Sequence, residues 1–111
     1  MILTLPFPPS VNSMFRNVNG RGRVKSAEYK AWLVEAGVML KQQKPRPPNG
    51  RVRITVDLDD KRRGDADNRI KPIIDLLVAH GVIPDDSKTY VKRMSIGWER
   101  VDDCVVSITP V

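Results

Sequence analysis

Regular spacing of apolar residues predicts the secondary structure of most of the chain. Helical spacing predicts one helix from a cap at Ser26 to about residue 43, and a second from about Asp67 to His80. Short apolar or alternating stretches predict strands at residues 1–7, 51–59, 88–99 and 103–110. The order β-α-β-α-β-β predicts one α/β (α+β) domain over residues 1–111, with two helices packed on a small mixed sheet.

Proline and glycine residues refine these boundaries. Pro6 and the prolines that follow it end the first strand, and the Asn/Gly-rich residues 8–25 predict an exposed loop. Pro72 is tolerated only in the first turn of a helix, so we expect the second helix to begin near residues 68–71. Gly81 lies where a glycine commonly ends a helix.

Charge is distributed unevenly along this basic chain. The net charge is +6 and the isoelectric point is 9.8. Residues 1–53 carry ten Lys/Arg and two acidic residues, whereas residues 54–111 carry nine and eleven. A basic domain favours a polyanionic partner, nucleic acid before membrane. Carboxylates near such a contact repel phosphate unless they hold metal ions, so the acidic second half calls for a separate explanation.

Acidic residues gather around the predicted second helix. Asp65 and Asp67 precede it, and Asp85 and Asp86 follow it. Two carboxylates at i and i+2 can converge on Mg²⁺, and a third returning from the far end of the helix, Asp85 or Asp86, could complete the site. Such an ion lowers the pKa of a water molecule and stabilises charge on a reacting phosphate.

A purely structural interpretation explains the same spacing. Asp and Asn at a helix start are common caps, and the pair at 85–86 could be a surface turn. Spacing alone supports the metal site and the cap equally. Lys71 lies four residues after Asp67 and four before Asp75, so a helix would place all three on one stripe.

At these residues the chain resembles the RusA family of Holliday junction resolvases. One matching pattern is Asp65-x-Asp67-Asn68-x-x-Lys71-x-x-x-Asp75-x-Leu77, followed by Gly81-Val-Ile-x-Asp85-Asp86. A second is Leu5-Pro6-x-Pro8-Pro9-Ser10-x-Asn12, with Arg16 following, and Ser26-Ala27-Glu28 also fits. The likeness runs from residue 3 to about residue 94.

The resemblance implies a homodimeric endodeoxyribonuclease that acts on four-way DNA junctions. It implies paired symmetric nicks in DNA recombination and repair, with Mg²⁺ required and Mn²⁺ as a substitute. Carried over to this chain, the family's essential carboxylates are Asp65, Asp67 and Asp86, which serve as catalytic residues and metal ligands, and its essential lysine is Lys71. Asp85 adjoins the third carboxylate and is an alternative ligand.

Basic residues outside this cluster are the expected DNA contacts. Phosphate contacts supply affinity rather than sequence selectivity. We expect them from Asn12, Arg16, Arg21, Arg23, Lys25, Arg62, Arg63 and Arg69. Two alternatives are a branched-DNA-binding protein without catalysis and a less selective flap or fork nuclease. With no apolar run of membrane-spanning length and no secretory signal, we expect a cytoplasmic protein. The family resemblance implies a bacterial protein, encoded by the host or by a prophage.

Overall fold

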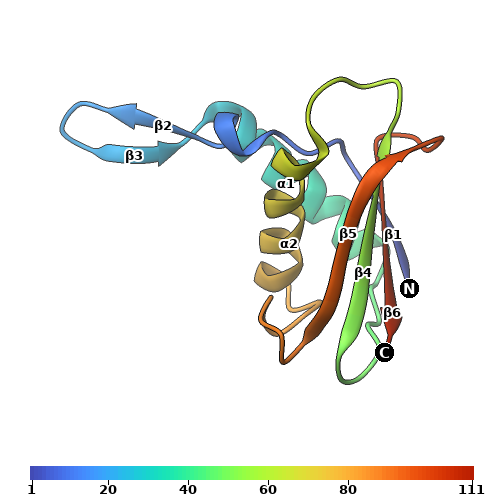
Figure 1. Cartoon of the computed structure of the whole chain (residues 1–111). Helices are drawn as coiled ribbons and strands as arrows, with labels where there is room; N and C mark the ends of the chain where they lie inside the picture. The colour runs from blue at the N-terminus through green and yellow to red at the C-terminus, as the bar shows by residue number, and fades with distance from the viewer.

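A four-stranded sheet carries two helices on one face (Figure 1). The computed structural model describes all of residues 1–111. The strands lie in the order β1-β6-β4-β5, and the helices lie between β1 and β5 in the chain. Their bounds are β1 Ile2–Leu5, α1 Ala27–Gln42, β4 Val52–Asp59, α2 Ile70–Ala79, β5 Val91–Glu99 and β6 Cys104–Pro110. β4 runs parallel to β5 and antiparallel to β6, so the predicted α+β class and mixed sheet are confirmed.

The core lies between the sheet and the two helices. Alternate residues of β4, from Val52 to Leu58, are buried and face the helices. Trp32 and Leu40 of α1 and Leu77 of α2 pack into the same cluster of 21 buried residues. Burying a large apolar side chain contributes roughly 1.5–3 kcal/mol. This core therefore fixes both ends of α2 relative to the sheet.

Both helices begin and end as the sequence predicts. The Ser26 hydroxyl accepts a hydrogen bond from the Tyr29 backbone N–H at 3.1 Å and caps α1. α2 begins at Ile70, which places Pro72 in its first turn. At the other end Gly81 has a φ of +71°, its N–H donates to the Val78 carbonyl, and the Val82 N–H donates to the Leu77 carbonyl. This pair of bonds is a Schellman motif, which requires the glycine.

The prediction of a loop over residues 8–25 was wrong. After a short 3₁₀ turn, η1 (Val11–Ser13), strands β2 (Phe15–Val18) and β3 (Gly22–Lys25) form an antiparallel hairpin that projects from the body (Figure 1). Each strand has only four residues, too few for a clear alternating pattern. Contacts made in the folded chain hold the hairpin: Phe15 packs edge-on against Tyr29, and Ser26 donates to the Met14 and Ser13 carbonyls through its N–H and hydroxyl.

Two further features complete the fold. The strand predicted from residue 88 begins at Val91, because Ser87 to Tyr90 form a turn closed onto the Ser87 carbonyl. Neither helix is long and apolar enough to cross a membrane.

Candidate active site and DNA-binding surface

The acidic turn, residues 59–69, links β4 to α2 and contains both predicted catalytic aspartates. Asp65 precedes the 3₁₀ turn η2 (Ala66–Asn68), and Asp67 lies within it. Both are exposed, and neither carboxylate makes a hydrogen bond or an ion pair within the chain. No side-chain cap closes η2 or α2. The cap interpretation therefore fails for this pair, whose oxygens are left available for an external cation.

The first half of the turn is fixed by Asp59, the last residue of β4. Its carboxylate is buried and accepts a hydrogen bond from the Lys61 N–H at 3.0 Å. Arg62 lies 3.9 Å from the same carboxylate and donates to Asp103 at 2.7 Å. These contacts tie the start of the turn to the loop between β5 and β6.

The second half of the turn is fixed by Arg69. Its Nη1 donates to the Pro8 carbonyl at 2.8 Å, its guanidinium lies 5.1 Å from the centre of the Phe7 ring, and its buried Nε has no partner. Arg62 lies 4.9 Å from the same ring, and Trp98 stacks on it at 6.3 Å. Pro8, one of the prolines that follow β1, thus anchors the acidic turn, and Arg69 is half-buried rather than free for phosphate.

Lys71 lies in the first turn of α2 and is exposed. Its Nζ pairs with Asp75 at 3.2 Å, as the i, i+4 spacing predicts. The stripe does not extend to Asp67, which lies outside the helix. Asp75 is also near Tyr29: burial raises the pKa of the Tyr29 phenol above its usual value, and the Asp75 carboxylate adds to the increase.

Asp85 and Asp86 lie at the opposite end of the sheet from the acidic turn. The parallel register pairs Val52 with Val91 at one end and Asp59 with Glu99 at the other. The acidic turn follows Asp59, whereas Asp85 and Asp86 precede Val91. The eight residues of β4 span about 23 Å between the two ends. The expectation that a third carboxylate joins Asp65 and Asp67 within one chain is therefore not met, and no group of three acidic, His or Cys side chains gathers for a metal.

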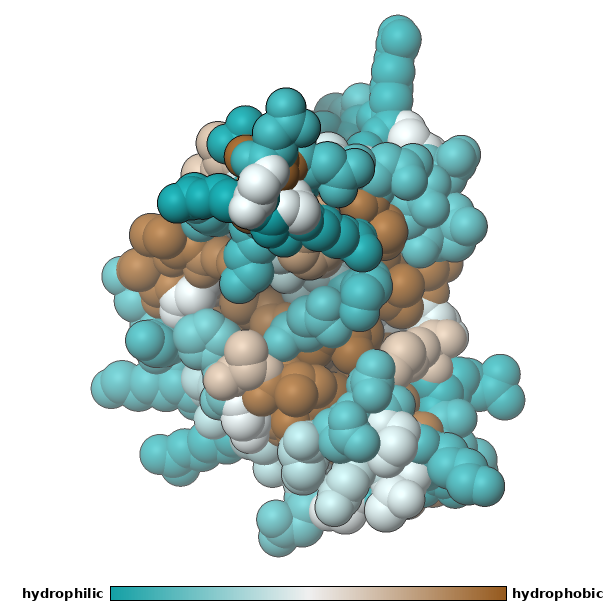
Figure 2. All heavy atoms as spheres, turned by 90° about the vertical axis from the view of Figure 1, so that its left-hand side faces the viewer, coloured by the Kyte–Doolittle hydropathy of each residue, from teal (hydrophilic) through white to brown (hydrophobic).

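The hairpin is the basic part of the surface. Arg16, Arg21, Arg23 and Lys25 are exposed, and none has a carboxylate partner. Arg23 lies over Phe15 at 4.2 Å and Lys25 over Tyr29 at 6.0 Å. Viewed from the hairpin side, hydrophilic side chains project above an apolar surface (Figure 2). Arg63 is likewise exposed and unpaired, and Asn12 is exposed on η1.

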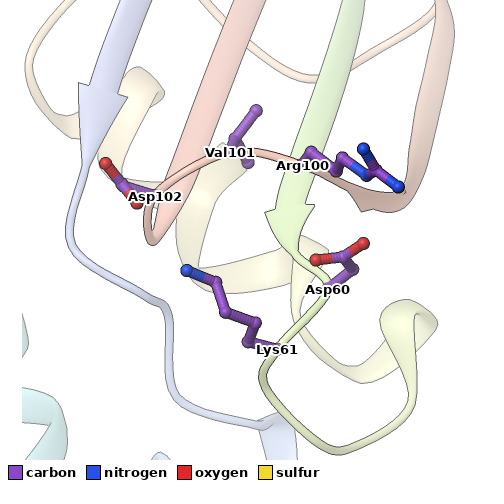
Figure 3. A pocket seen from close by; sticks show the side chains of 5 residues that line it. All are labelled: Asp60, Lys61, Arg100, Val101 and Asp102. Atoms are coloured by element: carbon purple, nitrogen blue, oxygen red, sulfur yellow. The ribbon is translucent and has the colours of Figure 1, made fainter.

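Sequence reasoning missed an open cavity of about 440 Å³ beside the acidic turn. Asp60 and Lys61 line it from the end of β4, and Arg100, Val101 and Asp102 from the loop between β5 and β6 (Figure 3). The two sides are about 40 residues apart in the chain, so no local pattern could reveal it. The charges of its two basic and two acidic lining residues cancel, so this cavity has no electrostatic preference for an anion.

Free carboxylates on a fixed turn, with a basic hairpin that makes no ion pairs on the same domain, are typical of a protein that acts on nucleic acid. The family model of endodeoxyribonuclease RusA matches residues 6–109. The chain is 35% identical over 97 residues to the crossover junction endodeoxyribonuclease of Enterobacteria phage 82, covering 83% of this chain and 78% of the relative. The corresponding protein of Escherichia coli strain K12 is 34% identical over 97 residues, which again cover 83% of this chain and 78% of the relative. That of Enterobacteria phage HK97 is 29% identical over 86 residues, 76% of this chain and 72% of the relative. The chain belongs to the RusA family and is an endodeoxyribonuclease.

Proposed function

We propose that this endodeoxyribonuclease resolves four-way (Holliday) DNA junctions by paired symmetric nicks, acting as a homodimer in the bacterial cytoplasm. Its relatives are crossover junction endodeoxyribonucleases of bacteria and phages, which supports this substrate. The observation that carries the proposal is the unpaired state of Asp65 and Asp67 in a chain of net charge +6. A DNA-binding protein without catalysis would gain nothing from carboxylates held free beside its basic surface.

The donor set of the acidic turn fits Mg²⁺, with Mn²⁺ as a substitute. Asp65 and Asp67 offer hard oxygen ligands, and neither is neutralised by Lys71, whose partner is Asp75. When bound, the ion would activate water and stabilise charge on the scissile phosphate. Asp65 and Asp67 would hold it, and Lys71 would offset negative charge that develops on the phosphate. Arg62 and Arg69 would hold the turn in place through Asp103 and Pro8.

A two-fold dimer accounts for the position of the third carboxylate. Two nicks on opposed strands of a symmetric substrate are made most simply by a C₂ pair. Asp86 lies beyond the end of the sheet opposite to the acidic turn of its own chain, too far away to share one ion with that turn. We therefore propose that Asp86, with Asp85 as the alternative, joins Asp65 and Asp67 of the partner subunit.

Cleavage of a synthetic four-way junction, with Mg²⁺ and with a chelator, tests the enzymatic part. Asp67→Asn should abolish cleavage and leave junction binding intact or stronger, because it removes repulsion from phosphate. Glu35→Gln, an exposed acid on α1, is the matched control and should cleave normally. Native cleavage by Asp67→Asn would refute the site, and equal cleavage of forks, flaps and linear duplex would refute junction selectivity.

Mixed dimers test the shared site. Asp67→Asn and Asp86→Asn chains are each expected to be inactive alone. If the ligands come from two subunits, a mixed dimer holds both substitutions in one site and leaves the other site intact, so mixing restores single nicks. If the ligands come from one subunit, both sites of the mixed dimer are defective and mixing restores nothing. A monomer in sedimentation at active concentrations would also refute the dimer.

A further inference from the structure

A second cavity lies at the base of the hairpin, where η1 leads into β2. Its volume is about 280 Å³. It is lined by Val11, Asn12, Phe15, Arg16, Asn17 and Arg23. Sites for drug-sized ligands measure roughly 300–1,000 Å³. This cavity therefore suits one small planar ring system and not a base pair.

The walls of the cavity combine a stacking surface with amide groups. Phe15 is half-buried and held edge-on by Tyr29, with ring centres 5.8 Å apart. The Arg23 guanidinium covers the Phe15 ring at 4.2 Å. Arg23 pairs with Asn17 in the hairpin register, which places the two side chains on the same face as Phe15. Aromatic rings and guanidinium planes are the surfaces on which proteins stack unpaired bases.

The polar side chains of the cavity make no hydrogen bond and no ion pair within the chain. Neither the Asn12 nor the Asn17 side chain makes a hydrogen bond, and Arg16 and Arg23 make no ion pair. An amide offers both a donor and an acceptor, which is what the edge of a nucleobase presents. The unpaired cations around it would bind the phosphates on either side of that base.

We propose that this cavity binds one unpaired nucleobase of the substrate, stacked on the Phe15–Arg23 pair and hydrogen-bonded by Asn12 and Asn17. The inference rests on the proposed function, because it takes branched DNA as the ligand. In a continuous duplex the base must first leave its stack, whereas bases at a branch point are more easily displaced. The cavity would thus distinguish branched DNA from duplex DNA by base accessibility.

Photocrosslinking tests the contact without any change to the hairpin. The Asp67→Asn chain is bound to a four-way junction that carries 5-iodouracil at each branch-point position in turn, and to a duplex with the same base in its centre. We expect a crosslink within residues 11–23, centred on Phe15, from the junction and not from the duplex. Equal yields from both DNAs, or no crosslink in this segment at saturating binding, would overturn the proposal.

Binding of substituted chains provides the second measurement. Loss of one base stack costs roughly 1–3 kcal/mol, so Phe15→Leu should weaken junction binding roughly tenfold and leave duplex binding unchanged. Arg21→Gln, a hairpin cation outside the cavity, should weaken both alike. If Phe15→Leu weakens both DNAs equally, the ring serves only to hold the hairpin. Because wild-type junction cleavage is measured separately, these outcomes do not depend on whether the enzymatic proposal holds.

Discussion

Gly64 precedes Asp65, the first of the two proposed catalytic aspartates, and cannot be replaced without strain. Its φ of +124° lies in a region that residues with a side chain rarely adopt. A Cβ added there would lie 2.9 Å from Nη2 of Arg69, a contact closer than van der Waals packing allows. Gly64→Ala therefore disturbs the backbone before Asp65 and the arginine that anchors the turn to Pro8.

The cost of Gly64→Ala follows from these two contacts. Backbone strain of this kind costs roughly 1–3 kcal/mol. The hydrogen bond from Arg69 to the Pro8 carbonyl, 2.8 Å long, has a charged donor, and such bonds contribute roughly 1.5–3 kcal/mol to stability. Weakening this bond should add about 1 kcal/mol to the loss of stability. We expect the free energy of unfolding to fall by about 2–4 kcal/mol. For a chain of this length the melting temperature should drop by about 4 °C per kcal/mol, hence by about 8–16 °C.

Urea unfolding and thermal melting measure this loss. Gly97→Ala is the matched control, because Gly97 has open space around its Cα and no positive φ, so it should change stability far less. Adding Arg69→Met to Gly64→Ala removes the close contact but not the strained φ, so the combined loss should be smaller than the sum of the separate losses. Equal stability of Gly64→Ala and the parent chain would refute the geometry of the turn.

Three other perturbations have outcomes that the structure determines. Burial raises the pKa of the Cys104 thiol to about 12, so native Cys104 should resist alkylation, and stability should fall as pH rises from about 9, where the unfolded thiol loses its proton, towards 12. Leu77→Ala, at a fully buried position of α2, should lower the free energy of unfolding by roughly 2–5 kcal/mol in urea titrations. Asp75→Asn should remove the ion pair that holds the Lys71 ammonium 3.2 Å from Asp75 and lower the rate of junction cleavage, because that ammonium is then no longer held in one position.

Each of these perturbations has its own contradicting result. A Cys104→Ala chain with the same loss of stability above pH 9 would assign the effect to other groups, Tyr29 first, since its pKa is also raised. Loss of less than about 1 kcal/mol in Leu77→Ala would mean that α2 is loosely packed. An unchanged rate of junction cleavage in Asp75→Asn would mean that the Lys71–Asp75 pair does not affect catalysis.

The sequence predicts the elements whose stability depends on a repeated pattern. β4 alternates over its whole length, and α2 combines an apolar stripe with Pro72 and Gly81 at its two ends. The hairpin was missed because its strands are short and depend on Phe15 packing against Tyr29, a contact between segments that no local pattern encodes. The fold class could therefore be predicted from the sequence, whereas the hairpin with the second cavity at its base could not.

The site was predictable only as far as its residues are close in the chain. The spacing of Asp65 and Asp67 indicated either a metal site or a cap, and the structure removes the cap. Arg69 was predicted to contact DNA, yet its guanidinium is engaged by Pro8 and Phe7, segments some 60 residues earlier. The sequence alone does not show which arginine makes long-range contacts in the folded chain, because the residues next to each arginine in the sequence do not reveal those contacts.

The sequence motif groups Asp86 with Asp65 and Asp67, whereas the structure of one chain places Asp86 far from both. A motif records which residues a site needs, and it does not record which subunit supplies them. α2 is straight and packed along the sheet by Ile73 and Leu77, so its two ends cannot approach each other without breaking the core. If Asp86 is as necessary as the family resemblance implies, the gap must be closed by a second chain. Cleavage would then require the dimer itself, so that nicks are made only where two subunits meet across a symmetric junction.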